Sequence, residues 1–429
     1  MMRSSVSYET FLKRVCIAVA VATMLISTQK VRAKSEALDI NAAQAILAVQ
    51  ALDGWLLRGH GSENKVAKSV LAVSGDSSWE WYFWVPAEGK AVLLHHVGDT
   101  NLFSSVKPEK RTYSSAGQMK RKLKLMLGGA STVAMEYAPK SGMERLTQVP
   151  LATVKRLKSS GLEIVSSAEL VQYTKARWGA KGRIAHYVAA HHLETLAQLA
   201  FDFVGREIRA GKKVTEHTVS KFIAKGFKDR GLVGPAPTVA VMENTKKASH
   251  APSIRTSATL VPGQILVIQL AGRVEYADIP IYAEGSWVAF LGRRIPENMS
   301  LAFSAVVGAR DTVLDELAKR FASGRTIKGY EVDQIAKKSL TESGFKDAWT
   351  SSTGHSMDGE RYGSGANLDD GRARDTRSLV KGTGFVVGPS IQTSLFGVRS
   401  AVSAYFGNNG LEVTMELQNQ ITSIDVSGA

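Results

Sequence analysis

The sequence predicts an α/β protein with two domains. Residues 46 to about 170 alternate strand-like runs with helical runs, and this alternation is typical of a layered α/β domain. From about residue 173 the order becomes a helix pair followed by strands, and the same order then occurs again, which indicates an internal duplication. We therefore expect an N-terminal α/β domain over residues 34–172 and a C-terminal domain over residues 173–429.

The strands of the first domain are expected where apolar residues alternate or run together between Gly, Pro and Ser. These strands are GWLLRG (54–59), SSWEWYFWVP (77–86), KAVLLHHV (90–97), STVAMEYAP (131–139) and LEIVSS (162–167). Helices are expected in AGQMKRKLKLML (116–127) and TVKRLKSS (153–160). We expect the aromatic side chains around Trp81 to pack in the core and on the strand faces rather than to form a ligand platform.

The second domain begins with a long amphipathic helix over residues 189–211, followed by a helix over residues 215–227 with Thr215 as its N-cap. The further expected elements are strands at 238–244, 264–273 and 275–285 and a second helix pair at 298–324 and 328–345. The closing strands lie in residues 381–407. This segment contains no Asp or Glu, and small residues stand where its two strands would face each other.

The N-terminus has the pattern of a secretory signal peptide. Lys13 and Arg14 precede an apolar run over residues 15–27, and the tripeptide VRA at 31–33 supplies small or apolar residues before a cleavage site. Cleavage after this tripeptide removes a signal peptide at residues 1–33 and predicts a periplasmic or extracellular protein. No later run of 18 uninterrupted apolar residues occurs, so no membrane span is expected in the mature chain.

The composition is that of a globular protein, with 429 residues, 44% hydrophobic residues and a formal net charge of +15. Removal of residues 1–33, which carry five basic and one acidic residue, leaves a net charge of +11. A basic surface attracts anionic polymers, lipid headgroups or nucleic acid. A solvated basic face explains the charge more simply, so no specific nucleic-acid partner is expected. Cys16 is the only cysteine and lies in the signal peptide, which excludes disulfides from the exported chain.

From about residue 46 to 427 the chain resembles the pita-bread metallopeptidases, which include proline aminopeptidase, prolidase, methionine aminopeptidase and the metal-free creatinase. The resemblance is carried by LDGWLL and WYFWVPAEG in the first domain and by GKKVTEHTV, TGHSMDGE, GANLDDGRARDTRSLVKGTGF and FGVRSA in the second. The aminopeptidase P-like branch, of Xaa-Pro aminopeptidases, is the most similar. The resemblance implies a creatinase/prolidase-like α/β domain followed by a C-terminal pita-bread domain.

In that family, activity needs two divalent cations such as Mn, Co or Zn, held by two Asp, one His and two Glu side chains. Residue by residue, the resemblance places the first Asp on Gln269 and the second on Asp278 in YADIP. The His is retained as His355 in STGHSM. The two Glu fall on Gly388 in VVGPSI and on Ala401 in GVRSAV. Asp278 and His355 are therefore implied as retained metal ligands, and the other three positions have lost their donors or their charge.

Two dications in such a site would leave about three positive charges uncompensated, and an unpaired buried charge costs several kcal/mol. We therefore expect no cofactor. The resemblance also implies that His250 in NTKKASHAP is the family's substrate-handling and proton-transfer His, and that Arg399 in GVRS contacts substrate. Two further histidines of the family fall on Ser351 and Gly363.

These replacements favour a secreted pseudopeptidase that is kept to bind a peptide or a partner protein, either as a homodimer or paired with an active relative. Two alternatives remain open. One is an active Xaa-Pro dipeptidase or aminopeptidase with an atypical metal site. The other is a metal-free, creatinase-like C–N hydrolase that uses His250 as its base. A purely electrostatic binder of an anionic surface is a further alternative from a different class.

Overall fold

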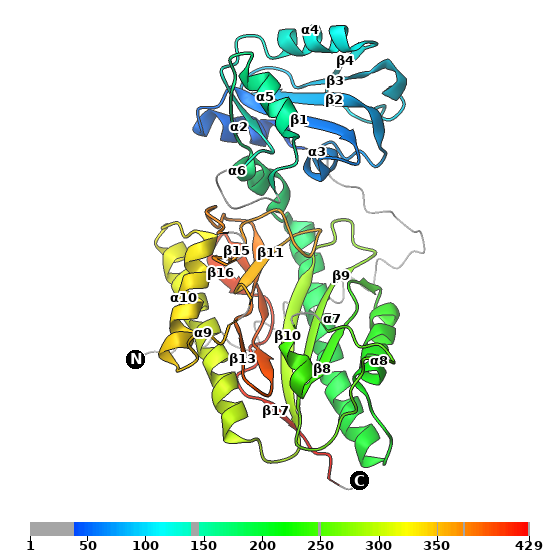
Figure 1. Cartoon of the computed structure of the whole chain (residues 1–429), viewed down its shortest axis with the longest axis vertical. Helices are drawn as coiled ribbons and strands as arrows, with labels where there is room; N and C mark the ends of the chain where they lie inside the picture. The colour runs from blue at the N-terminus through cyan, green and yellow to red at the C-terminus, as the bar shows by residue number, and fades with distance from the viewer. Residues whose placement is uncertain (1–37, 139–145, 248–249, 350, 372–373, 428–429) are drawn as a thin grey trace.

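The computed structural model describes residues 38–138, 146–247, 250–349, 351–371 and 374–427 (Figure 1). The predicted signal peptide lies outside the described residues. The described chain is an α/β structure, as the sequence predicts, with one sheet in its N-terminal part and further sheets beside two helix pairs in its C-terminal part.

The N-terminal sheet consists of β1 (Gly54–Gly61), β2 (Ser77–Pro86), β3 (Val92–His96), β4 (Glu109–Tyr113), β5 (Thr132–Met135) and β6 (Glu163–Ser166). Its strand order is β4-β3-β2-β1-β5-β6. The central strands β1, β2 and β3 pair antiparallel, whereas β4, β5 and β6 add in parallel. The accompanying helices are α2 (Ile40–Val49), α3 (Lys65–Val70), α4 (Ala116–Met126), α5 (Leu151–Lys158) and α6 (Ala168–Val171).

The aromatic cluster of β2 fills both faces of this sheet. Trp81 and Phe83 belong to one core cluster, and Tyr82 and Trp84 belong to the cluster on the opposite face. This division follows from the alternation of side chains along a strand. Trp79 differs, because it is about half exposed and stacks on the ring of His96 with centroids 4.0 Å apart. The expectation of core and strand-face packing is therefore confirmed.

The C-terminal part contains the helices α7 (Ala180–Arg209), α8 (Glu216–Asp229), α9 (Glu297–Ala322) and α10 (Gly329–Glu342). α7 begins nine residues before the expected start at residue 189, because the preceding segment continues the apolar stripe and buries His186. The N-cap of α8 is confirmed, since the Thr215 side chain accepts a hydrogen bond from the backbone N–H of Thr218. No helix within the described ranges has the length and apolar character needed to cross a membrane.

The strands of the C-terminal part are β7 (Leu232–Val233), β8 (Thr238–Val241), β9 (Ile265–Val274), β10 (Ala283–Leu291), β11 (Gly354–Met357), β12 (Gly384–Val387), β13 (Ser390–Gln392), β14 (Gly397–Arg399), β15 (Val402–Gly407), β16 (Gly410–Val413) and β17 (Thr422–Ile424). One sheet has the order β17-β10-β9-β7, with β8 also paired to β9, and a second has the order β11-β12-β15-β16. A two-stranded sheet joins β13 and β14. In Figure 1 these strands lie between the pair α7–α8 and the pair α9–α10.

The two helix pairs are tied to the sheets in the same way. Thr215, at the start of α8, forms an isolated bridge with Thr259, and Lys328, at the start of α10, forms one with Ser378. In each case the N-terminus of the second helix of the pair is joined to a segment that follows the pair in the chain. This matched geometry supports the internal duplication that the order of elements predicts.

One expected strand begins later than the sequence pattern indicates. The pattern predicts a strand over residues 275–285, whereas β10 begins at Ala283. The intervening residues connect β9 to β10, and Pro280 in this connection has no N–H to donate to a strand ladder. Asp278 therefore lies on the connection and not on the strand.

Candidate functional site

The candidate site lies where β10 meets the closing strands. Ser286 holds this junction, because its backbone N–H donates to Ala401 O over 3.0 Å while its hydroxyl donates to Arg399 O over 3.1 Å and accepts from Ala401 N over 2.8 Å. Ser403 of β15 binds Glu284 in a similar way. Its hydroxyl accepts from Glu284 N over 2.9 Å and donates to Glu284 O over 2.8 Å. Two serine hydroxyls therefore join β10, which belongs to one sheet, to the segment of β14 and β15, of which β15 belongs to the second sheet.

The carboxylate of Glu284 lies at the centre of the site and is only 1% exposed. Arg361 binds it with two hydrogen bonds, from Nε to Oε2 and from Nη2 to Oε1, each 2.7 Å long. Gln269 Nε2 of β9 donates to Oε1 over 2.6 Å, and His355 Nε2 of β11 lies 3.4 Å from Oε2. A bidentate guanidinium therefore neutralises a buried carboxylate that would otherwise need another cation.

The electrostatics of this cluster follow from the pairing. Burial alone would raise the pKa of Glu284, but hydrogen bonds from Arg361 and His355 outweigh it and hold the pKa well below its usual range. Burial would lower the pKa of Arg361, and the pairing with Glu284 raises it instead. The guanidinium also lies over the ring of Tyr362, which in turn lies 4.5 Å from the ring of His355. Glu284 is therefore ionised and compensated at neutral pH.

Gly388 and Ala401 pack directly against each other. A Cβ at position 388 would lie 2.7 Å from Ala401 Cβ and 2.9 Å from Arg399 Nε, so a larger side chain requires these groups to move. Arg399 Nε donates to Gly388 O over 3.0 Å. Burial lowers the pKa of Arg399, although the nearby Glu284 acts in the opposite sense. The small residues of this acid-free segment are therefore packed together beside an arginine.

Asp278 is not part of this cluster. Its carboxylate pairs with Lys181 of α7 over 2.8 Å, and 64% of its side chain is exposed. Glu284 lies beside Gln269 and His355 instead, because β10 begins after the connection that carries Asp278. The structure therefore does not bring Asp278 to the predicted ligand positions Gln269 and His355, and Glu284 is the acid of this hairpin that faces His355.

His250 is held by a buried glutamate. Its Nε2 lies 2.9 Å from Oε2 of Glu216, the first residue of α8. Glu216 is fully buried and also accepts hydrogen bonds from the Asn244 amide and from backbone N–H groups. Within the described residues, the contacts of His250 do not reach Glu284 or His355, so the structure does not bring this histidine into the cluster.

The positions of the two further family histidines hold groups that are fixed by neighbours. The Ser351 hydroxyl is hydrogen-bonded to the Ser390 hydroxyl over 2.9 Å. Gly363 N donates to Ser356 O over 2.8 Å, and a Cβ at position 363 would lie 2.9 Å from Asp358 N. An imidazole at position 363 therefore does not fit without movement of the backbone.

The fold and the position of the site define a protein of the pita-bread peptidase class. Residues 185–407, just over half of the chain, match the model of metallopeptidase family M24, and the chain belongs to this family. A comparison with curated proteins finds no match.

Solved structures share the fold at low sequence identity. Dipeptidase PepE from Mycobacterium ulcerans is 16% identical with a TM-score of 0.67, over 90% of this chain and 97% of that chain. X-Pro aminopeptidase from Thermotoga maritima MSB8 is 16% identical with a TM-score of 0.59, over 90% and 99%. The N-terminal domain of FACT complex subunit SPT16 from Cicer arietinum is 13% identical with a TM-score of 0.59, over 89% and 98%.

The family corrects the expectation that no cofactor is needed. M24 is a metallopeptidase family, and the similar structures include a prolidase from Thermococcus sibiricus, so metal dependence is a property of the family. The donors present here do not fit the family's pair of dications, because Glu284 is bound by Arg361 and because Gly388 and Ala401 carry no donor side chain. Among the described residues, no group of three or more His, Cys, Asp or Glu is placed to hold a metal ion.

The sequence analysis missed Glu284 and Arg361, although both residues carried a signal. Glu284 is the one acid in the apolar run AEGSWVAFL of β10, and an acid in a buried strand needs a partner. Arg361 follows His355 by six residues in HSMDGER. Assigning the second acidic position to the apolar run of β10, rather than to the YADIP motif, would have identified Glu284.

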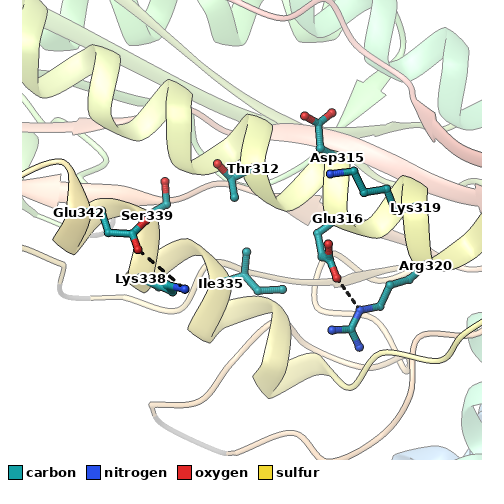
Figure 2. Close-up of a pocket in the computed structure, with 9 residues that line it drawn as sticks. All are labelled: Thr312, Asp315, Glu316, Lys319, Arg320, Ile335, Lys338, Ser339 and Glu342. Carbon is teal, nitrogen blue, oxygen red and sulfur yellow. Dashed lines mark hydrogen bonds and ion pairs between the residues drawn. The ribbon is translucent and has the colours of Figure 1, made fainter.

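A groove lies between α9 and α10, with a volume of about 350 Å³ (Figure 2). Side chains of both signs line it, and they pair with each other: Arg320 Nε lies 2.8 Å from Glu316, and Lys338 Nζ lies 3.8 Å from Glu342. The groove shares no lining residue with the cluster around Glu284. Its mixed charge gives no preference for an anionic or a cationic ligand.

Proposed function

We propose that this chain is an M24-family protein that binds a peptide or a partner protein without hydrolysing a peptide bond. The proposal rests on the bidentate pair between Arg361 and Glu284. Hydrolysis in a two-metal site requires carboxylates that hold the ions and so activate a bridging water. Here the acid that faces His355 is already neutralised by a guanidinium, and Gly388 and Ala401 supply no second carboxylate.

A metal-free hydrolytic mechanism has less support. It requires a general base within reach of the substrate, and His250 was the candidate. Its Nε2 is held by the buried carboxylate of Glu216, which leaves Nδ1 as the only available base, and within the described residues no contact joins His250 to the cluster around Glu284. A binding role is compatible with the uses of this fold, since one similar structure is named as a subunit of a complex and others as peptidases.

The test is an assay of the mature chain supplied with an excess of Mn, Co or Zn and with Xaa-Pro dipeptides and longer Xaa-Pro peptides. We expect no release of the N-terminal residue or of proline above that of heat-denatured protein. Metal-dependent release that is lost in His355→Ala but kept in His192→Ala would overturn the proposal in favour of an active Xaa-Pro peptidase. His192 is a matched control, because it lies on α7 and outside the cluster.

We also propose that the chain is exported and that it acts as a homodimer or in a pair with an active relative. The sequence of residues 1–33 and the absence of a later 18-residue apolar run support export. Light scattering on the mature chain, alone and mixed with an active M24 peptidase from the same cell, tests the assembly. A chain that stays monomeric in both measurements would contradict it.

A further inference from the structure

A small cleft opens beside the Glu284 cluster. Gln269 of β9, Arg399 of β14 and Ser351 line it, together with Lys246 and Lys247 from the turn that follows β8. Its volume is about 50 Å³. A single water needs about 10–15 Å³ by this kind of measure, so the cleft has room for a group the size of a few water molecules.

The charges that line the cleft are of one sign. Among the described lining residues the charged side chains are Lys246, Lys247 and Arg399, and no acid is present. Lys246 is neutralised in part, because its Nζ pairs over 2.5 Å with Glu243, whose side chain is 65% exposed. Lys247 Nζ donates to the neutral Asn244 Oδ1 over 2.6 Å, and no acid among the described residues forms an ion pair with it.

Arg399 is the cation with the most available donors. Within the described residues it forms no ion pair, and its one hydrogen bond runs from Nε to Gly388 O. Its two terminal amino groups therefore remain to bind a ligand. The nearest carboxylate, that of Glu284, is already taken up by the guanidinium of Arg361.

Neutral donors line the same cleft. The Ser351 and Ser390 hydroxyls both line the cleft and share one hydrogen bond of 2.9 Å. Since a pair of hydroxyls carries two hydrogens and their mutual bond uses one, a second hydrogen is left to donate to a ligand. The cleft therefore offers a guanidinium, an ammonium and a hydroxyl around a small volume.

We propose that this cleft binds the oxyanion group of a ligand, either a carboxylate or a phosphate. A guanidinium presents parallel N–H groups that match two oxygens of a carboxylate or a phosphate, and such charge-assisted hydrogen bonds are the strong ones. The inference rests on the proposed function, because it names the chemical group that a non-hydrolytic site would recognise. A site that held two dications would need a lining of the opposite sign.

The experiment is a calorimetric titration of the full mature chain at low ionic strength. The probes are inorganic phosphate, an acetylated dipeptide with a free C-terminal carboxylate, and the same dipeptide as its C-terminal amide. We expect saturable binding of phosphate, of the carboxylate or of both, and none of the amide. Binding of phosphate alone assigns the cleft to phosphate, and binding of the carboxylate alone assigns it to a peptide C-terminus.

Arg399→Gln is expected to weaken the binding at least about tenfold, as loss of a charged hydrogen-bond donor does. Arg320→Gln in the groove of Figure 2 is the matched control and should leave the Kd unchanged. Lys247→Gln changes an exposed side chain and is expected to weaken binding several-fold, so it tests the inference even when Arg399→Gln does not fold.

Two results would overturn the inference. One is the absence of saturable binding of both anions to the unmodified chain. The other is a Kd in Arg399→Gln, or in Lys247→Gln where the first variant is unfolded, equal to that of the unmodified chain. Failure of anion binding in a protein that also cleaves no peptide rejects this inference and leaves the proposed function standing. Peptide cleavage rejects the proposed function whatever the anion titrations show.

Discussion

Replacing Arg361 with Met removes the counter-charge of Glu284 and keeps most of the side-chain volume. The carboxylate, 1% exposed, would retain the hydrogen bond from Gln269 as its main partner. Removing one member of a buried ion pair costs about 3–5 kcal/mol of unfolding free energy. Because the Gln269 amide still donates to the carboxylate, we expect a loss at the lower end, near 3 kcal/mol. With a slope of about 1–3 kcal/mol per molar urea, the midpoint of unfolding should fall by about 1–3 M.

The dependence on pH makes this prediction specific. In the unmodified protein the pKa of Glu284 is lowered on folding, so the stabilisation is complete above the unfolded pKa and is lost as the pH falls toward the folded pKa. In Arg361→Met, burial raises the pKa of Glu284 above its unfolded value. The variant should therefore lose stability as the pH rises, and the difference between the two proteins should be larger at about pH 8 than at about pH 5.

Urea unfolding followed by circular dichroism at these two pH values measures the effect. Adding Glu284→Gln to Arg361→Met removes the unpaired charge and should recover more than half of the loss. Arg374→Met is the control, because the Arg374 side chain that pairs with Asp370 is 55% exposed, and the change should alter stability by less than about 1 kcal/mol. A loss of less than about 1 kcal/mol in Arg361→Met that does not vary with pH would refute the role of Arg361 as the counter-charge.

Three further predictions concern packing, titration and processing. Gly388→Ala should destabilise the protein by about 1–3 kcal/mol in urea unfolding. Gly308→Ala is the control, because position 308 lies on an open face of α9, and it should stabilise the protein by up to about 1 kcal/mol. The reverse order of stability would contradict the packing at position 388. Burial raises the pKa of Glu194 to about 7, so stability should fall as the pH rises through 5 to about 7. In Glu194→Gln this decline should be smaller, and an unchanged slope would count against the assignment. N-terminal sequencing of the exported protein should read from Lys34, and retention of the full-length chain inside the cell would contradict the signal peptide.

The elements that the sequence predicted correctly are those in which the apolar pattern and the residues at its ends indicate the same boundaries. The strand around Trp81 has an alternating apolar pattern and ends at Pro86, and α8 begins where Thr215 can cap it. The strand predicted over residues 275–285 also alternates, but its backbone hydrogen bonds go elsewhere. Tyr282 N, for example, donates to Asp358 O, and such a contact between distant segments leaves no local pattern.

The site was predictable in part. The resemblance assigned Gly388 and Ala401 to one site, and the structure places them in contact, since a Cβ added at position 388 would lie 2.7 Å from Ala401 Cβ. It could not place Arg361, because a motif of metal ligands contains no position for a cationic side chain. The loop that carries Arg361 is brought to Glu284 by tertiary contacts, and an ion pair between residues 77 positions apart has no signature in spacing.

The hydroxyl bridges at Ser286 and Ser403 have a kinetic consequence. A hinge motion that moved β10 away from β14 and β15 would break several hydrogen bonds at once, each worth about 0.5–1.5 kcal/mol. The cleft is therefore expected to keep one arrangement while a ligand binds. In stopped-flow experiments the observed rate should rise linearly with ligand concentration and reach no plateau, since no slow rearrangement precedes or follows the collision.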